Sequence, residues 1–187
     1  RQVNVVGSSI ARESDAVLYT WAGPEISVAT TKAYSCQLAV FYLLALKFAQ
    51  IRSTITPDTF QTLLTALKQL PDQIEGLLSQ KEKIQFFANH YLATEHIFFM
   101  GRGIDYAISM EGSLKLKEIS YIHSEAYAAG ELKHGTISLM EDGTLVVALA
   151  TQDALYPKTV SNMIEVKTRG AFVMALSTCL LYTSPSP

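Results

Sequence analysis

The sequence predicts an α/β fold organised around a doubly wound parallel sheet, and two observations indicate it. The segments 95–100, 144–150 and 171–176 are short and apolar almost throughout, as are strands that a parallel sheet buries on both faces. Longer segments with a helical spacing of apolar residues separate them. Strands that alternate with helices in this way pair in parallel, and the helices then cover both faces of the sheet.

Composition and charge limit the functional classes. With 187 residues, of which 49% are hydrophobic, the chain can hold one domain or parts of two around a sizeable core. A net charge of −2 argues against a nucleic-acid partner and against a membrane surface. The most apolar run, 38–49, is interrupted by Lys47 and is too short to cross a bilayer. Cys36 and Cys179 are far apart, which indicates reduced thiols and a cytoplasmic protein.

The first ninety residues are expected to contain two strands, 2–6 and 15–20, followed by helices. A Gly7-Ser8-Ser9 turn after the first strand could hold a phosphate through its backbone N–H groups, although a plain turn is the commoner explanation. The helix 32–50 is apolar nearly all round, which predicts that other elements bury it. Further helices without recognisable chemistry are expected at 57–70, from Pro71 onward and at 80–92.

A short turn follows the first strand of the second half of the chain. The strand 95–100 leads into Gly101-Arg102-Gly103 and then directly into a helix at 105–120. Strand, glycine turn and helix suit a phosphate, but a lone Gly-x-Gly is a weak signal and the fuller dinucleotide fingerprint is absent. We therefore expect a tight turn and no nucleotide cofactor.

Three ionisable residues share one narrow sector of the helix 105–120. Glu111, Lys115 and Glu118 are spaced i, i+4, i+7, so they project from the same side at about 100° per residue. Apolar residues flank this sector, and a buried ammonium between two carboxylates would have its pKa shifted toward catalytic use. The alternative is an ordinary Glu–Lys pair on a helix surface. The side that is expected to face water carries Ser109, Ser113, Lys117 and Ser120.

The run Glu-Gly-Ser-Leu-Lys-Leu-Lys-Glu-Ile-Ser-Tyr-Ile-His-Ser-Glu-Ala-Tyr-Ala-Ala-Gly-Glu-Leu-Lys-His-Gly, Glu111 to Gly135, resembles the sugar-isomerase (SIS) domains of the glutamine–fructose-6-phosphate aminotransferases. The resemblance covers residues 2–176. It implies that residues 1–52 are the C-terminal part of a first SIS domain and residues 53–176 most of a second, incomplete at its C-terminus. Residues 177–187 have no counterpart in the family and are expected to be a non-native tail.

The resemblance also implies roles for single residues. In that family fructose 6-phosphate is aminated and isomerised to glucosamine 6-phosphate. Glu118 would move a proton between C1 and C2 of the sugar, Lys115 would stabilise the charge of the intermediate, and Glu111 would hold Lys115. His134 would help to open the sugar ring, and the backbone at Val28 would hold the sugar. Thr136 stands where the family is expected to carry a proline, which leaves the loop of His134 less rigid.

Partners follow from the same resemblance. It implies a sugar phosphate as substrate, a homodimer in which the neighbouring subunit supplies the histidine, and a glutaminase domain of the same full-length chain. It implies neither a metal nor another cofactor. This stretch is expected to be a middle part of the isomerase half and inactive alone. Two alternatives are a fructosamine-phosphate deglycase on the same fold and a non-catalytic sugar-phosphate-sensing SIS module.

Overall fold

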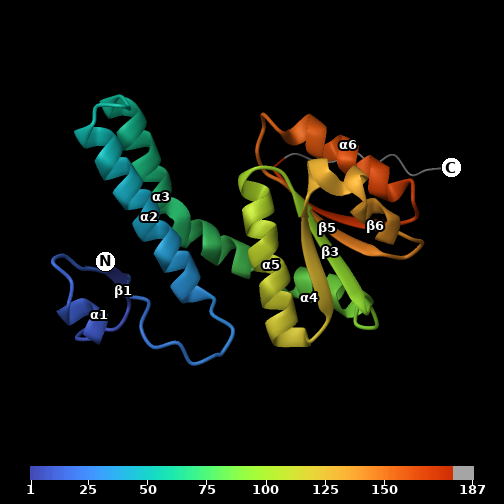
Figure 1. Cartoon of the computed structure of the whole chain (residues 1–187), viewed down its shortest axis with the longest axis horizontal. Coiled ribbons are helices and arrows are strands. Elements are labelled where there is room, and N and C mark those ends of the chain that lie inside the picture. The colour runs from blue at the N-terminus through green and yellow to red at the C-terminus, as the bar shows by residue number, and fades with distance from the viewer. Residues whose placement is uncertain (179–187) are drawn as a thin grey trace. The chain divides into compact units, whose positions relative to one another are not determined.

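The computed structural model describes residues 1–178 and consists of two compact units, Arg1–His90 and a second unit that begins at Tyr91 (Figure 1). Two of the helices that follow residue 52 belong to the first unit. The compact units therefore divide the chain at a later point than the predicted boundary between two SIS domains.

The first unit combines a two-stranded parallel sheet with helices. Its strands β1 (Gln2–Val3) and β2 (Leu18–Tyr19) are shorter than predicted. The Ser8 hydroxyl accepts a hydrogen bond of 3.3 Å from the backbone N–H of Ala11, so the predicted glycine–serine turn caps a short helix. The helices of this unit are α1 (Ser9–Arg12), α2 (Lys32–Ile51), α3 (Pro57–Leu78) and α4 (Lys81–His90).

The helix α3 is longer than expected. It begins as predicted at Pro57, and the Thr56 hydroxyl caps it by accepting a hydrogen bond of 3.1 Å from the N–H of Thr59. The expected break at Pro71 is wrong, because the helix continues through this residue to Leu78. A proline inside a helix removes one backbone hydrogen bond, and the good helix formers Lys68, Gln69 and Leu70 precede this one.

The helix α2 is mostly exposed, which contradicts its predicted burial. Of its twenty residues, all of which the structure describes, only Leu46 is buried, and Phe41 and Phe48 expose more than half of their surface. The reason is that α3 covers only one flank of α2. Even there, an apolar groove of about 520 Å³ lies between the two helices. By length and composition α2 could also cross a membrane, because it extends beyond the run 38–49, but a core helix of a soluble protein meets the same criteria.

The second unit is built on a four-stranded sheet in the order β4-β3-β5-β6, in which all strands are parallel. This arrangement confirms the predicted α/β fold. The strands are β3 (His96–Gly101), β4 (His123–Ala128), β5 (Leu145–Ala150) and β6 (Phe172–Ser177). The helices are α5 (Ile104–Ser120), the 3-10 segments η1 (Ala129–His134) and η2 (Thr136–Leu139), and α6 (Tyr156–Lys167).

Helices cover the two faces of this sheet, as a doubly wound fold requires (Figure 1). The larger apolar core lies on the face covered by α6 and η1. There Met100 and Val146 of the sheet pack with Leu132 of η1 and with Met163 and Val166 of α6. The opposite face, along β3 and β4, is covered by α5.

The side of α5 that meets the sheet is the side that was expected to face water. Ser109 and Ser113 are buried, and Gly112 lies so close to Phe99 that an added Cβ would be 3.1 Å from the Phe99 ring. Small residues allow the helix axis to approach the sheet closely, and Ser113 finds hydrogen-bond partners there. The prediction for Lys117 and Ser120, which are exposed, is confirmed.

The last strand has the predicted length but lies one residue later in the chain. β6 ends at Ser177, which pairs with Ala150 of β5. The predicted non-native tail thus begins with a residue of the sheet, and its residues from 179 onward lie outside the described part of the chain.

Candidate active site

The three ionisable residues of α5 form one contiguous group. Lys115 lies between two carboxylates: its Nζ is 2.5 Å from Oε2 of Glu118 and 3.6 Å from Oε1 of Glu111. The spacings i, i+3 and i, i+4 bring these side chains together on consecutive turns of the helix. The contacts predicted from the sequence are confirmed, and we call Glu111, Lys115 and Glu118 the α5 triad.

The surroundings of the α5 triad differ from the prediction. Its side chains are partly exposed, with exposed fractions of 22% for Glu111, 20% for Lys115 and 32% for Glu118. The flanking apolar residues Leu114 and Ile119 are exposed as well. The triad therefore sits on the outer side of α5 within a patch of uncovered apolar surface, and the expected burial in an apolar arc is wrong for this chain.

The two carboxylates act on the acid–base behaviour of Lys115. The hydrogen bond with Glu118 raises the pKa of Lys115 above its ordinary value, and the charges of Glu118 and Glu111 add to the rise, while partial desolvation opposes it. The ammonium therefore stays protonated at neutral pH. A protonated lysine beside a carboxylate can stabilise negative charge on a bound molecule while the carboxylate accepts a proton.

His134 lies in a different element from the triad. It is the last residue of η1, and Gly135 follows with a φ of +140°, a conformation that L side chains rarely adopt. Its Nδ1 is 2.8 Å from Oε2 of Glu131, and both side chains are largely exposed. The predicted accessibility of His134 is confirmed, and its side chain contacts Glu131 rather than a residue of the triad.

Val28 belongs to the first unit. It lies in the loop that precedes α2 and exposes 97% of its surface, while the neighbouring Ala29 is buried. The burial of Ala29 thus holds the backbone next to Val28 in place, while the side chain of Val28 points to solvent. A role through the backbone, as predicted, is compatible with this placement.

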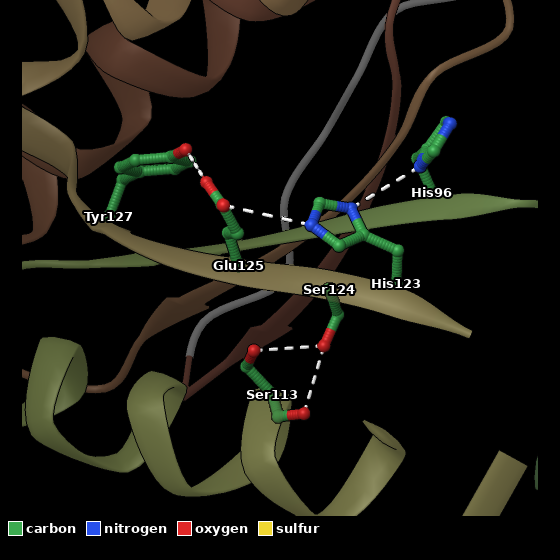
Figure 2. A network of polar contacts seen from close by, with 6 residues as sticks. All are labelled: His96, Ser113, His123, Ser124, Glu125 and Tyr127. Carbon is green, nitrogen blue, oxygen red and sulfur yellow. Dashed lines mark hydrogen bonds and ion pairs between the residues drawn. The ribbon is translucent and has the colours of Figure 1, made fainter. Parts of the chain in front are cut away.

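Polar contacts fix α5 against the edge strand β4, as Figure 2 shows. The Ser124 hydroxyl donates to the backbone carbonyl of Ser113 at 2.8 Å, and the two hydroxyl oxygens are also 2.8 Å apart. Both residues are buried, so these bonds are shielded from water. They set the position of the helix two residues before Lys115.

A second polar row lies on the other side of β4 (Figure 2). Nδ1 of His123 is 3.3 Å from Nδ1 of His96, its Nε2 is 3.6 Å from Glu125, and Glu125 also contacts the hydroxyl of Tyr127. Successive residues of a strand point to opposite faces, which explains why Ser124 turns toward α5 while His123 and Glu125 turn away from it. Among residues 1–178 no group of three or more His, Cys, Asp or Glu side chains is arranged to hold a metal ion.

Comparison with known proteins identifies the family of this fold. A family model described as the SIS domain matches residues 3–47 and 91–184. The chain belongs to the SIS domain family. The SIS match includes β3 to β6 with α5, η1 and α6, and it runs past residue 177, where the tail was predicted to begin.

Similar SIS proteins carry related names. The chain is 59% identical over 174 residues to a glutamine–fructose-6-phosphate aminotransferase (isomerising) of Caldanaerobacter subterraneus subsp. tengcongensis, and 57% identical over 174 residues to that of Clostridium acetobutylicum. These matches cover 93% of this chain and 29% of each relative. Among solved structures, the C-terminal domain of glucosamine–fructose-6-phosphate aminotransferase from Francisella tularensis matches with a TM-score of 0.90 and 40% identity, over 93% of this chain and 49% of that one.

Sequence reasoning missed two groups around this site. Glu131, the partner of His134, could have been found from its place three residues before a histidine in a glycine-bracketed segment. The pair Ser113 and Ser124 gave no signal, because the contact depends on the pairing of β4 with β3.

Proposed function

We propose that this chain is part of the isomerase half of a glutamine–fructose-6-phosphate aminotransferase, which binds fructose 6-phosphate and converts it with ammonia to glucosamine 6-phosphate. The observation that carries the proposal is the α5 triad, in which an ammonium held by two carboxylates lies on a helix of an SIS fold. The names of relatives at 59% and 57% identity support it. Because the chain spans about 29% of the length of these relatives, the activity belongs to the intact protein.

In the proposed reaction ammonia adds to the C2 carbonyl of the open-chain sugar, and water leaves to form an imine. The Glu118 carboxylate then removes a proton from C1 and returns it to C2, while the proton of the C1 hydroxyl group passes to the nitrogen, which leaves an aldehyde at C1 and an amine at C2. The Lys115 ammonium stabilises the electron-rich intermediate between the two transfers. Glu111 keeps Lys115 in place at 3.6 Å from the far side.

His134 would open the ring of fructose 6-phosphate before this step. Its Nδ1 faces the Glu131 carboxylate, so in neutral imidazole the proton resides there and Nε2 is left to act on a sugar oxygen. The family resemblance implies a homodimer in which the histidine of one subunit serves the triad of the other, and the proposal includes it. Val28 would contribute backbone contacts to the sugar.

The proposal also covers the domain organisation of the intact protein and its location in the cell. Residues 1–52 would be the end of one SIS domain and residues 53–176 most of a second; the two separate segments that the family model matches are compatible with this division. A glutaminase domain of the full-length chain would supply ammonia, and the intact protein would be cytoplasmic. The non-native origin of the tail stays a prediction, and the match up to residue 184 counts against it for the first part of that segment.

The substitution Glu118→Gln in a full-length aminotransferase that carries this stretch tests the proposal. The carboxamide keeps the shape of the side chain but cannot take the proton, so turnover should fall on the order of 10²- to 10⁴-fold. Affinity for a sugar-phosphate product analogue should stay close to that of the wild type. Lys117→Gln, which changes an exposed lysine of the same helix outside the triad, is the matched control and should leave both quantities unchanged.

Two outcomes would refute the assignment. Near-normal turnover of the Glu118→Gln enzyme would show that Glu118 is only a structural partner of Lys115. A parallel loss of binding and turnover, accompanied by unfolding, would show the same. Unaltered binding with no turnover in the wild type itself would instead favour the sugar-phosphate-sensing alternative.

A further inference from the structure

A small polar cavity lies beside α6, away from the α5 triad. Its volume is about 240 Å³, and residues of the β3–α5 turn, of η1 and of α6 line it. Volumes of about 300–1,000 Å³ are usual for drug-sized ligands, so this cavity suits a smaller molecule or one group of a larger one. Neither the proposed reaction nor the family resemblance uses it.

The lining of the cavity is positively charged. Arg102, Lys133 and Lys158 contribute three cations and Glu165 one carboxylate, a net charge of +2. The carboxylate is already paired, since Lys133 Nζ lies 2.8 Å from Oε1 of Glu165. That bond lowers the pKa of Glu165, with help from a hydrogen bond of Asn162 and against partial desolvation, so the group is ionised at neutral pH. Within residues 1–178 no hydrogen bond or ion pair engages Lys158, which leaves its ammonium available.

The arginine is held in a defined position. Its Nε and Nη2 both donate to Oδ1 of Asn162, at 3.0 and 2.8 Å, and Asn162 is 5% exposed. Gly130 lies against the guanidinium, where an added Cβ would be only 3.1 Å from its nitrogens. A guanidinium fixed on one edge by a buried amide keeps its remaining N–H groups directed at the cavity.

The topology of the sheet also places the cavity where α/β folds bind ligands. Arg102 follows the carboxyl end of β3, and Gly130 follows that of β4. The chain leaves β3 toward β4 on one side and later continues through β5 to β6 on the other, so the strand order reverses between β3 and β5. Ligands of open α/β sheets bind outside the carboxyl ends of the strands at such a point.

We propose that this cavity binds the phosphate group of a small phosphorylated molecule. A phosphate ester carries a charge of about −1.5 to −2 at pH 7, which balances the net charge of the lining. The guanidinium of Arg102 offers paired N–H donors, Lys158 a mobile ammonium, and Ser161 a hydroxyl. A carboxylate, with a single charge, would leave the cavity positive.

The test uses inorganic phosphate as the probe and the 187-residue chain as the protein. Phosphate replaces chloride at constant ionic strength while backbone amide signals are followed by NMR. We expect saturable shifts at Gly130, Lys158 and Ser161, whereas phosphate that bound at the α5 triad instead would shift residues 111–118. This difference separates the present inference from the proposed function, on which it does not depend.

Three variants test which side chains of the cavity bind phosphate. Lys158→Gln removes the unpaired cation of the cavity within the described residues and leaves the Arg102–Asn162 bonds intact. Phosphate affinity should therefore fall about fivefold or more, as expected for the loss of one charge-assisted contact near solvent. Ser161→Ala should weaken binding by less. Lys167→Gln is the matched control, because it removes an exposed lysine of the same helix outside the cavity. The absence of saturable shifts, an unchanged affinity in Lys158→Gln, or an equal loss in Lys167→Gln would each overturn the proposal.

Discussion

The helices α2 and α5 show that apolar content alone does not decide which residues are buried. The strongly apolar helix α2 buries only Leu46 among the described residues. The buried residues of α5 are Asp105, Ser109 and Ser113, all of them polar. A sheet accepts small residues and pairs their polar groups, whereas a single neighbouring helix covers one flank. Burial therefore follows from the shape and hydrogen-bonding capacity of the neighbour.

The same glycine-to-leucine substitution, made once in each unit, should test this difference in packing most clearly. Gly112→Leu forces a side chain into the space occupied by Phe99, so we expect it to lower the free energy of unfolding of the second unit by about 1–3 kcal/mol. Gly76→Leu in α3 meets nothing within 4 Å and should stabilise its helix slightly, because glycine is a poor helix former. Hydrogen exchange of α5 and α3 amides measures each effect in its own unit. Equal effects at the two positions would contradict the close packing of α5.

A buried hydroxyl should matter more than an exposed one. Ser124→Ala leaves the buried Ser113 hydroxyl without its partner, and we expect a loss of about 1–3 kcal/mol in stability. Ser35→Ala in α2 removes a weak exposed bond and should change stability by less than about 0.5 kcal/mol. Denaturant unfolding measures both. A double-mutant cycle with Ser113→Ala should show that the two serines are coupled, and additive effects would argue that no such bond forms.

The ionic network of α6 should have the smallest effect, visible only in acid. Glu165 has a pKa below its ordinary value of 4.5, so its contribution to stability is present above pH 4.5 and is lost as the pH falls through the lowered pKa. Glu165→Gln should therefore flatten the decline of stability below pH 4.5. Unfolding curves between pH 7 and pH 3 measure it, with Glu141→Gln, an exposed carboxylate on the same unit, as control. If the stability of Glu165→Gln and of Glu141→Gln declines equally as the pH falls, the ion pair of Glu165 does not contribute to stability.

The sheet illustrates what could be predicted from the sequence and what could not. β3, β5 and β6 were predicted because a central parallel strand is apolar throughout. The strand β4 was missed because it lies at the edge and carries His123 and Glu125 on one side. An edge strand buries less of its surface, so its residues alternate and the apolar signal disappears.

The candidate site also has features that the sequence predicted and others that it did not. Helical spacing was enough to predict the contacts of Lys115 with Glu111 and Glu118, because they are set within a single helix. The direction in which α5 faces was predicted wrongly, since it depends on the contact of Gly112 with Phe99 in another element. The assignment of catalytic roles to the triad and to His134 rests on family resemblance and stays a proposal.

The central claim is that Glu118 moves the proton at C1, and an isotope measurement tests it most directly. Fructose 6-phosphate deuterated at C1 is supplied with an ammonia source to the full-length enzyme, and NMR follows the loss of deuterium from C1, whether to C2 or to water. The wild type and Lys117→Gln should remove deuterium at similar rates, and Glu118→Gln should be slower by about 10²-fold or more while it still binds the sugar phosphate. If Glu118→Gln removes deuterium from C1 at the rate of the wild type, another group is the base and the account is wrong.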